Sequence, residues 1–272
     1  MSSEGKSLSK SALPGPRQVM SPSSDASLAL PRILCLHGGG TNARIFKAQC
    51  RGIRAALAKD FRLVFAEAPY PSVPGPDVTS VYGEWGPFKS WIPTGDLGAA
   101  GHAETVDRAL GQAVDADDAL GATGEWIAVL GFSQGAKLAA SLLLRQQRQQ
   151  RQQQQGWKSE AMWSGETPAV PSFSFGVIMA GRAGLLDLGP GPTRGQGAVL
   201  PMPMLEQHQR LDVASIHVHG LQDPGLELHR DMLKDFRDPV LVEWDGGHRL
   251  PIKTLHVGKV VDSIRQVARQ FL

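Results

Sequence analysis

Short runs of apolar residues alternate along the chain with longer stretches in which apolar residues recur at helical spacing. The short runs end at glycine or polar residues, and they predict buried strands at 32–36, 63–66, 126–130, 173–180, 215–220 and 239–243. The stretches between them predict helices at 42–57, 103–120, 136–145, 226–236 and 257–271. This alternation predicts an α/β protein with a mainly parallel, doubly wound sheet flanked by helices on both faces.

The first 30 residues are rich in serine and proline and show no hydrophobic period. Such a stretch buries too little apolar surface to offset the entropy lost on ordering. It lacks the apolar core of a secretory signal and the basic amphipathic period of a transit peptide. We therefore expect a disordered tail at 1–30 and one domain at 31–272.

Two segments of this domain depart from the alternating pattern. Residues 69–93 form a loop rich in proline, glycine and aromatic side chains, and so long a loop is uncommon unless it covers a site. The tract at 145–156 consists almost entirely of Gln and Arg and has no apolar residue that could face a core. We expect residues 146–170 to be a solvated low-complexity insertion.

The composition excludes several classes of protein. Lys and Arg number 28 and Asp and Glu number 26, so the formal net charge of +2 is too small for an electrostatic nucleic-acid binder. No apolar run approaches the roughly 20 residues needed to cross a bilayer, so we expect no integral membrane protein. The two cysteines, Cys35 and Cys50, cannot build a disulfide framework or a thiolate metal site. We expect a cytoplasmic protein.

The strongest chemical signal is the pentapeptide Gly-Phe-Ser-Gln-Gly at 131–135, which lies between a predicted strand and a predicted helix. In that context G-x-S-x-G is typical of a nucleophilic serine on a sharp turn, whose flanking residues must be small. The helix that follows favours negative charge developing at its N-terminus. Ser133 is therefore the candidate nucleophile.

A serine nucleophile needs a histidine base, and in this architecture the chain order is serine, acid, histidine. His248 lies in a glycine-containing loop between the sixth predicted strand and the last helix, which is where the base is expected. His217 and His219 share one face of the fifth predicted strand, and we interpret them as buried, hydrogen-bonded strand residues. A metal pair at these two positions is disfavoured because no Asp, Glu or Cys lies nearby in the sequence, and no metal site is predicted.

The acid that orients the base is expected after the fifth strand, because functional groups of open parallel sheets gather at the carboxyl ends of strands. Asp223 lies in a turn at that end, before Pro224. A turn-capping role is the alternative for this residue. Asp245 is the competing acid, but its place three residues before His248 makes an approach to the far side of the ring harder.

The oxyanion of an acyl-transfer reaction needs two preorganised N–H groups. One is expected from Gln134, the residue after the nucleophile, and the other from the glycine loop after the first strand. We assign the second to Gly39, with Gly38 and Gly40 as alternatives. Three aromatic residues of the long loop are candidates for an apolar substrate pocket, although simple packing explains them equally well: Trp85, Phe88 and Trp91.

Several motifs together resemble the fungal FSH serine hydrolases: L-H-G at 36–38, G-F-S-Q-G-A at 131–136, S-F-G-V-I-M-A-G at 174–181, H-V-H-G-L-Q-D-P at 217–224 and G-G-H at 246–248. The resemblance covers about residues 31–272 and implies the α/β-hydrolase fold, with Ser133, Asp223 and His248 as the triad. The Gln/Arg tract and the serine-rich N-terminus are extra to the family pattern.

Many relatives of this kind are encoded in fungal polyketide gene clusters, so the resemblance implies an esterase or thioesterase of secondary metabolism. The expected substrate is a small acyl ester or a carrier-bound thioester, and the expected partner is a polyketide synthase. No cofactor is required. An acyl-protein thioesterase or general carboxylesterase is the alternative activity, and a non-catalytic binding protein on the same fold is the alternative of another class.

Overall fold

The computed structural model describes residues 25–76, 78–93, 101–154, 170–188 and 210–272. Its centre is a six-stranded sheet in the order β2-β1-β5-β6-β7-β8, with parallel pairing throughout. The strands are β1 Arg32–Leu36, β2 Arg62–Ala66, β5 Trp126–Phe132, β6 Phe175–Met179, β7 Ala214–Gly220 and β8 Val240–Trp244. Each corresponds to a predicted strand, so the prediction of a parallel sheet is confirmed.

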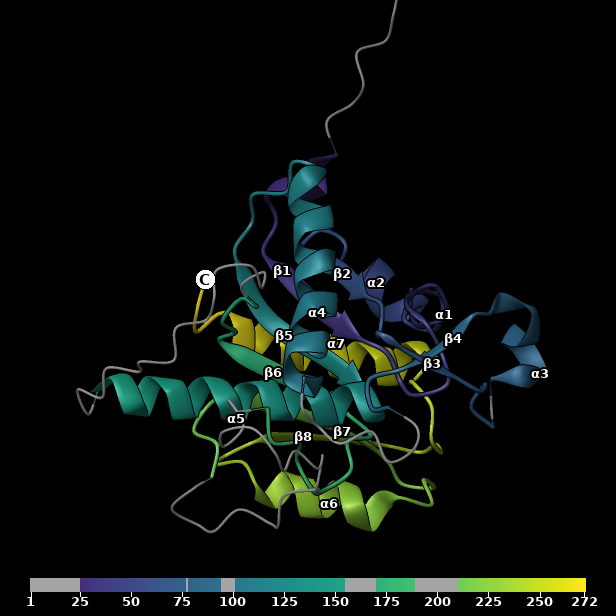
Figure 1. Ribbon diagram of the computed structural model, residues 1–272. Coiled ribbons are helices and arrows are strands. Elements are labelled where there is room, and N and C mark those ends of the chain that lie inside the picture. Colours follow the sequence, from purple (N-terminus) through teal and green to yellow (C-terminus); the bar gives the residue numbers. More distant parts are fainter. Residues whose placement is uncertain (1–24, 77, 94–100, 155–169, 189–209) are drawn as a thin grey trace, which may run out of the picture.

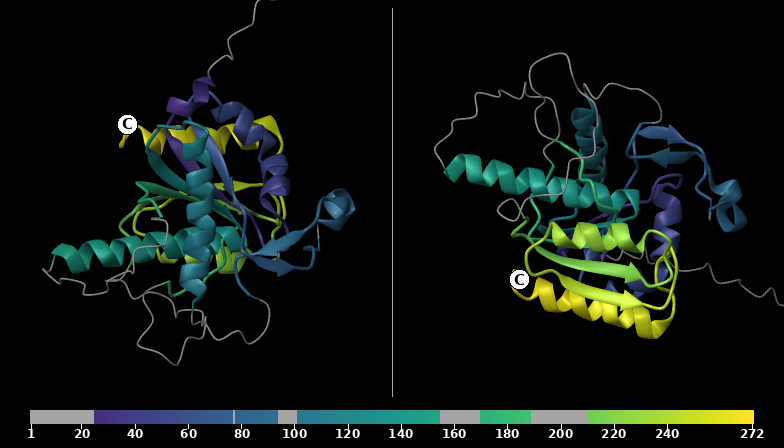
Figure 2. Two further views of the ribbon diagram at one scale, coloured as in Figure 1. Left: turned by 45° about the horizontal axis from the view of Figure 1, so that its top comes forward. Right: turned by 90° about the horizontal axis from the view of Figure 1, so that it is seen from below.

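Helices cover both faces of the sheet (Figure 1), as the alternating pattern predicts. One apolar cluster joins the sheet to α1 Ala43–Gln49, α2 Arg51–Leu57 and α7 Thr254–Ala268. A second joins the other face to α4 His102–Ala119, α5 Gln134–Gln154 and α6 Leu226–Lys234. Figure 2 shows α6 and α7 on opposite sides of β7 and β8. Side chains pack on both faces, and this burial is why the strands are continuously apolar.

The predicted helix at 42–57 is interrupted. Asn42 caps α1, because its side chain accepts a hydrogen bond from the Ile45 N–H at 2.8 Å. The helix stops at Cys50, whose ψ of 5° lies outside the helical range, and α2 begins at the next residue. Ile53 and Leu57 of α2 are buried in the same apolar cluster as Phe46 of α1, so both pieces still cover the sheet.

We predicted a loop at 69–93, but this segment contains an antiparallel hairpin. Its strands are β3 Tyr70–Ser72 and β4 Phe88–Ser90, and α3 Thr79–Tyr82 and the 3-10 turn η2 Gly83–Trp85 lie between them. Lys89 in β4 also pairs with the loop after β1 through Gly40 and Thr41. Backbone groups that would otherwise lack partners are thereby satisfied, and the hairpin projects beyond α1 (Figures 1 and 2).

The Gln/Arg tract is part of α5, and the prediction that it is entirely solvated is wrong for its first turns. The Gln147 side chain is buried, donates to the Arg210 carbonyl at 2.9 Å and accepts from the Asp212 N–H at 2.6 Å. Gln146 makes the same pair of bonds to the backbone of Phe173. Polar side chains thus anchor this helix through hydrogen bonds where apolar residues are lacking. Residues 155–169 of the predicted insertion lie outside the described part.

The ordered domain begins before residue 31, contrary to the predicted tail boundary. Ala26–Ala29 form a 3-10 helix, η1, with Asp25 as its N-cap. The Arg62 guanidinium donates to Asp25 at 3.1 Å and to Ser27 at 2.6 Å, which fixes this segment against β2. Residues 1–24 of the predicted tail lie outside the described residues. Among the helices of the described part, none is both long and apolar enough to span a membrane.

Candidate active site

Ser133 stands on the turn between β5 and α5, at the carboxyl end of the sheet. Its φ of 54° places it in the left-handed region, which a non-glycine residue adopts only under constraint. The flanking glycines leave no room for side chains: a Cβ at Gly131 would lie 2.2 Å from the Gly135 carbonyl oxygen, and one at Gly135 would lie 2.1 Å from the Leu36 carbonyl oxygen. Both glycines of the G-x-S-x-G motif are therefore explained by the close approach of three backbone segments: β5, the start of α5 and the end of β1.

A continuous hydrogen-bonded chain joins Ser133, His248 and Asp223. The Ser133 Oγ lies 2.9 Å from His248 Nε2, and His248 Nδ1 lies 2.7 Å from Asp223 Oδ2. Because an ionised carboxylate only accepts hydrogen bonds, Nδ1 carries the proton and Nε2 is free to accept from the serine hydroxyl. The structure thus brings together the three residues predicted from separate segments of the sequence.

The Asp223 carboxylate is enclosed, with none of its side-chain surface exposed. Burial raises the pKa of Asp223, but hydrogen bonds from the Gly225 N–H at 2.8 Å and from His248 outweigh burial and hold the pKa below its usual value. Asp223 is therefore ionised at neutral pH. Asp245, the competing acid, is exposed and accepts a hydrogen bond from the Gln222 side chain instead.

The two residues predicted to supply the oxyanion hole, Gln134 and Gly39, lie close together although they come from different segments. A Cβ added at Gly39 would lie 3.1 Å from the Gln134 side-chain nitrogen, which places the β1–α1 loop directly over the start of α5. The Gly40 N–H donates to the Lys89 carbonyl at 2.9 Å, so this alternative donor is already used. Gln134 is the first residue of α5, and its N–H has no acceptor within the helix.

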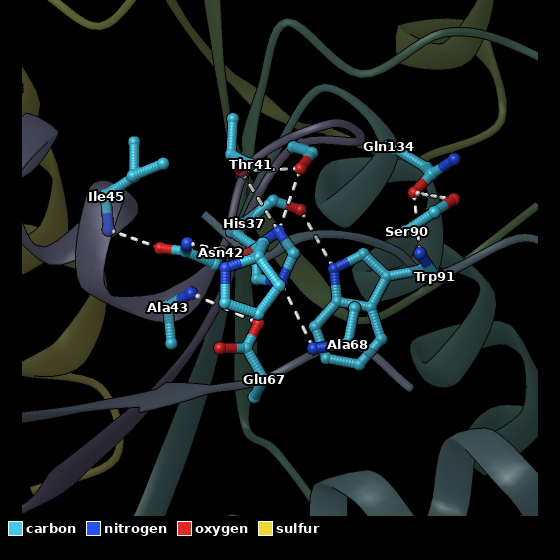
Figure 3. Close-up of polar contacts among 12 residues, drawn as sticks. His37, Thr41, Asn42, Ala43, Ile45, Glu67, Ala68, Ser90, Trp91 and Gln134 are labelled. Carbon is cyan, nitrogen blue, oxygen red and sulfur yellow. Dashed lines mark hydrogen bonds and ion pairs between the residues drawn. The ribbon is translucent and has the colours of Figure 1, made fainter. Parts of the chain in front are cut away.

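A polar network holds the β1–α1 loop in place (Figure 3). The buried His37 ring accepts from the Ala68 N–H at Nε2, and its Nδ1 faces the Gly38 carbonyl and the Thr41 hydroxyl. The Gln134 side-chain oxygen accepts from the Trp91 N–H at 2.7 Å and from the Ser90 hydroxyl at 3.1 Å. The loop, the hairpin and the start of α5 are thereby tied together.

The three aromatic residues predicted for a substrate pocket are not placed alike. Trp91 is completely buried and its indole N–H donates to the His37 carbonyl at 2.9 Å, so it supports the loop and does not line an open pocket. Trp85 is half-buried beneath the Arg44 guanidinium, 4.1 Å from its ring, and Phe88 is half-buried in β4. A hollow of about 620 Å³ among the described residues lies at the amino ends of β6 and β7, away from Ser133.

Sequence reasoning missed one residue at the site, His229 on α6. Its Nε2 lies 3.7 Å from Asp223 Oδ2, and its ring centroid lies 6.2 Å from that of His248. His219 and His217 continue this row of rings into the core. A histidine six residues after the acid, on the helix that follows it, is a signal that the sequence did contain.

These histidines are buried as predicted for His217 and His219, but the prediction that they are hydrogen-bonded is not met. Within the described part of the chain, both ring nitrogens of His217 and of His229 and the Nδ1 of His219 have no hydrogen-bond partner. Burial lowers the pKa of His217 to about 3 and the pKa values of His219 and His229 to about 4. All three rings are neutral at pH 7.

A strained serine turn with its hydrogen-bonded histidine and aspartate, at the carboxyl end of a parallel sheet, is typical of serine hydrolases with the α/β-hydrolase fold. The model of the family described as "Serine hydrolase (FSH1)" matches residues 26–260. The chain belongs to this serine hydrolase family, as its motifs indicate.

Relatives from fungi match over most of their length. A "Probable esterase" of Aspergillus terreus is 51% identical over 249 residues, which are 90% of this chain and 91% of the relative. An "Esterase" of Didymella fabae is 45% identical over 263 residues, with 90% and 93% covered. The crystal structure of Arabidopsis thaliana SOBER1 aligns with a TM-score of 0.50 at 14% identity, covering 88% of this chain and 99% of that one. The last likeness bears on the fold alone.

Proposed function

We propose that this serine hydrolase is an esterase in which Ser133 is the nucleophile, His248 the general base and Asp223 the residue that orients the base. The observation that carries the proposal is the chain of contacts of 2.9 Å and 2.7 Å through the His248 ring. Relatives named as esterases support the choice of an ester bond. A non-catalytic binding protein would have no need for the strained backbone at Ser133.

The geometry supports acyl transfer to water in two steps. His248 Nε2 takes the hydroxyl proton as Ser133 Oγ attacks the ester carbonyl carbon, and the resulting imidazolium is stabilised by Asp223. The imidazolium then protonates the leaving alcohol as the acyl-enzyme forms. In the second step a water molecule loses its proton to His248 and attacks the acyl carbon, and the protonated His248 returns that proton to the departing Ser133 oxygen.

The negative charge that develops on the carbonyl oxygen needs donors that are already in position. We assign these donors to the backbone N–H groups of Gln134 and Gly39. The ties from Gln134 Oε1 to Trp91 and from Thr41 to the Gly38 carbonyl hold the two segments in register. Preorganised donors of this kind cost no reorganisation energy during the reaction.

The substrate that donates the acyl group is a more detailed part of the proposal. A small acyl ester is the first substrate class, and a thioester carried by a polyketide synthase is the second, supported by the resemblance to esterases of polyketide clusters. A cytoplasmic location stays a prediction from the sequence.

The proposal is tested by hydrolysis of p-nitrophenyl butyrate and of an N-acetylcysteamine thioester. Ser133→Ala should lose several powers of ten in kcat on both substrates, because nucleophile and base act as one unit. Ser263→Ala is the matched control, since Ser263 is a partly exposed serine of α7 whose hydroxyl donates to the Lys259 carbonyl at 2.9 Å. Near wild-type rates in Ser133→Ala would contradict the assignment, and the ratio of the two wild-type rates decides between ester and thioester.

A further inference from the structure

Among the described residues, three side chains that can bind a metal lie close together, and the proposed mechanism uses only two of them. Asp223, His229 and His248 each offer a ligand atom, and these atoms all lie within 4.8 Å of one another. We propose that these three residues form a site for a Zn²⁺ ion that reversibly inhibits the esterase. The proposal deepens the proposed function, because two of the three ligands are also the proposed acid and base.

His229 is the independent sign of a ligand. None of its side-chain surface is exposed, and neither of its ring nitrogens has a hydrogen-bond partner in the described residues. Buried polar atoms are normally satisfied, and each exception calls for a partner such as a water or an ion. The His229 Nε2 lies 3.7 Å from Asp223 Oδ2, too far for a hydrogen bond. In the tautomer that carries its proton on Nδ1, this nitrogen offers its lone pair to an ion bound beside the carboxylate.

The spacing suits a transition metal after small movements. Tetrahedral zinc with ligand bonds of about 2.0–2.1 Å holds its ligand atoms about 3.3 Å apart. The present separations are 2.7 Å from Asp223 to His248 Nδ1 and 3.7 Å from Asp223 to His229 Nε2. These two separations differ from the zinc value by about 0.6 and 0.4 Å, and the ligand atoms of His229 and His248 lie within 4.8 Å of each other, so the loop that carries His248 has to shift for all three to bind one ion. The His248 side chain is 25% exposed and lies in a loop, so an ion can reach the cluster from that side.

The donor set selects the class of cation. Two imidazoles and one carboxylate suit Zn²⁺ and its transition-metal neighbours, whereas Mg²⁺ and Ca²⁺ prefer sites made of oxygen. The Arg182 guanidinium opposes any cation here, because it packs so closely beside Gly225 that a Cβ there would lie 2.9 Å from Arg182 Nε. We therefore expect weaker binding than at a resident metal site, as befits an inhibitory ion.

Coordination would switch off the base through its tautomer. If zinc binds His248 at Nδ1, the proton of that neutral ring moves to Nε2, and no proton is gained or lost overall. Nε2 then donates a hydrogen bond and cannot accept the proton of Ser133. The nucleophile stays in place while its activation is lost, and removal of the ion restores the original tautomer.

The test measures binding and inhibition separately. Zinc binding to protein pretreated with EDTA is followed by isothermal titration calorimetry in wild type and in Ser133→Ala, which keeps all three ligands without turning over substrate. We expect one ion per chain in both, and visible absorption typical of a tetrahedral site when Co²⁺ replaces Zn²⁺. Inhibition of p-nitrophenyl butyrate hydrolysis should follow the same binding curve and be reversed by EDTA.

His229→Phe keeps the bulk of the ring and removes the ligand, so zinc affinity should fall about tenfold or more. His256→Phe is the control, because His256 lies on α7 outside the cluster and should leave both binding and inhibition unchanged. Asp223→Asn provides a second variant should His229→Phe fail to fold, and it too should weaken binding in calorimetry.

Zinc binding of equal strength in wild type and His229→Phe would overturn the proposal, as would no binding to Ser133→Ala at millimolar Zn²⁺. A protein that binds zinc through His229 and hydrolyses no ester would instead refute only the proposed function. The two failures are therefore distinguishable.

Discussion

Replacement of Asp223 by Asn changes a single atom behind the base and should cripple hydrolysis. The Gly225 N–H holds the carboxylate through Oδ1, so the Asn carbonyl would occupy that position and direct the amide NH₂ toward His248. Two donors would then face each other at Nδ1. His248 would have to carry its proton on Nε2, where it can no longer accept from Ser133.

The expected magnitude follows from the enclosure of the pair. The carboxylate is fully shielded and lies 2.7 Å from the ring nitrogen, so little solvent screens its interaction with the imidazolium of the transition state. We expect kcat to fall by about 10⁴, or about 5 kcal/mol of activation free energy, with little change in KM. Asp245→Asn is the matched control: its carboxylate is exposed and bonded to Gln222, so kcat should change by about tenfold or less.

The assay is hydrolysis of p-nitrophenyl butyrate by wild type and both variants at one pH, with thermal unfolding as a check on folding. A severe loss in Asp245→Asn together with a mild loss in Asp223→Asn would refute the assignment of the acid. A mild loss in both variants would refute the importance of the carboxylate itself.

Two further predictions concern stability. The pKa of His217 is about 3 in the folded chain and about 6.5 when unfolded, so stability falls as the pH drops below 6.5. Between pH 8 and pH 5 the wild type should lose about 2 kcal/mol more than His217→Leu in urea unfolding; equal losses would show that this ring is not the acid-sensitive group. Gln147→Ala should cost about 2 kcal/mol by leaving the Arg210 carbonyl and the Asp212 N–H without their partner, whereas the exposed Gln152→Ala should cost almost nothing. Similar unfolding midpoints for these two variants would contradict the anchoring role of Gln147.

The sequence was sufficient to predict the sheet and the turn at Ser133, because both depend on local pattern. Continuous apolar runs identify buried parallel strands, and small residues around a serine identify a turn too tight for side chains. The order of serine, acid and histidine along the chain then narrows the search to residues after particular strands, which is how Asp223 and His248 were selected.

What the sequence could not provide depends on contacts between distant segments. The hairpin at 70–90 forms because Lys89 pairs with Gly40 and Thr41, and no local periodicity encodes that pairing. Gln147 is buried because two backbone groups near residue 211 need partners, so its polar character gave the wrong expectation. The spacing of six residues between Asp223 and His229 is visible in the sequence, but the contact between them depends on how the turn before α6 folds.

The most direct test of the central claim is covalent labelling of the nucleophile with a fluorophosphonate, read by intact mass and peptide mapping. We predict that wild type gains one adduct on Ser133, that Ser133→Ala gains none, and that Asp223→Asn is labelled far more slowly. Folded wild-type protein that stays unlabelled, or an adduct on another serine, would contradict the claim that Ser133 is the nucleophile of this hydrolase.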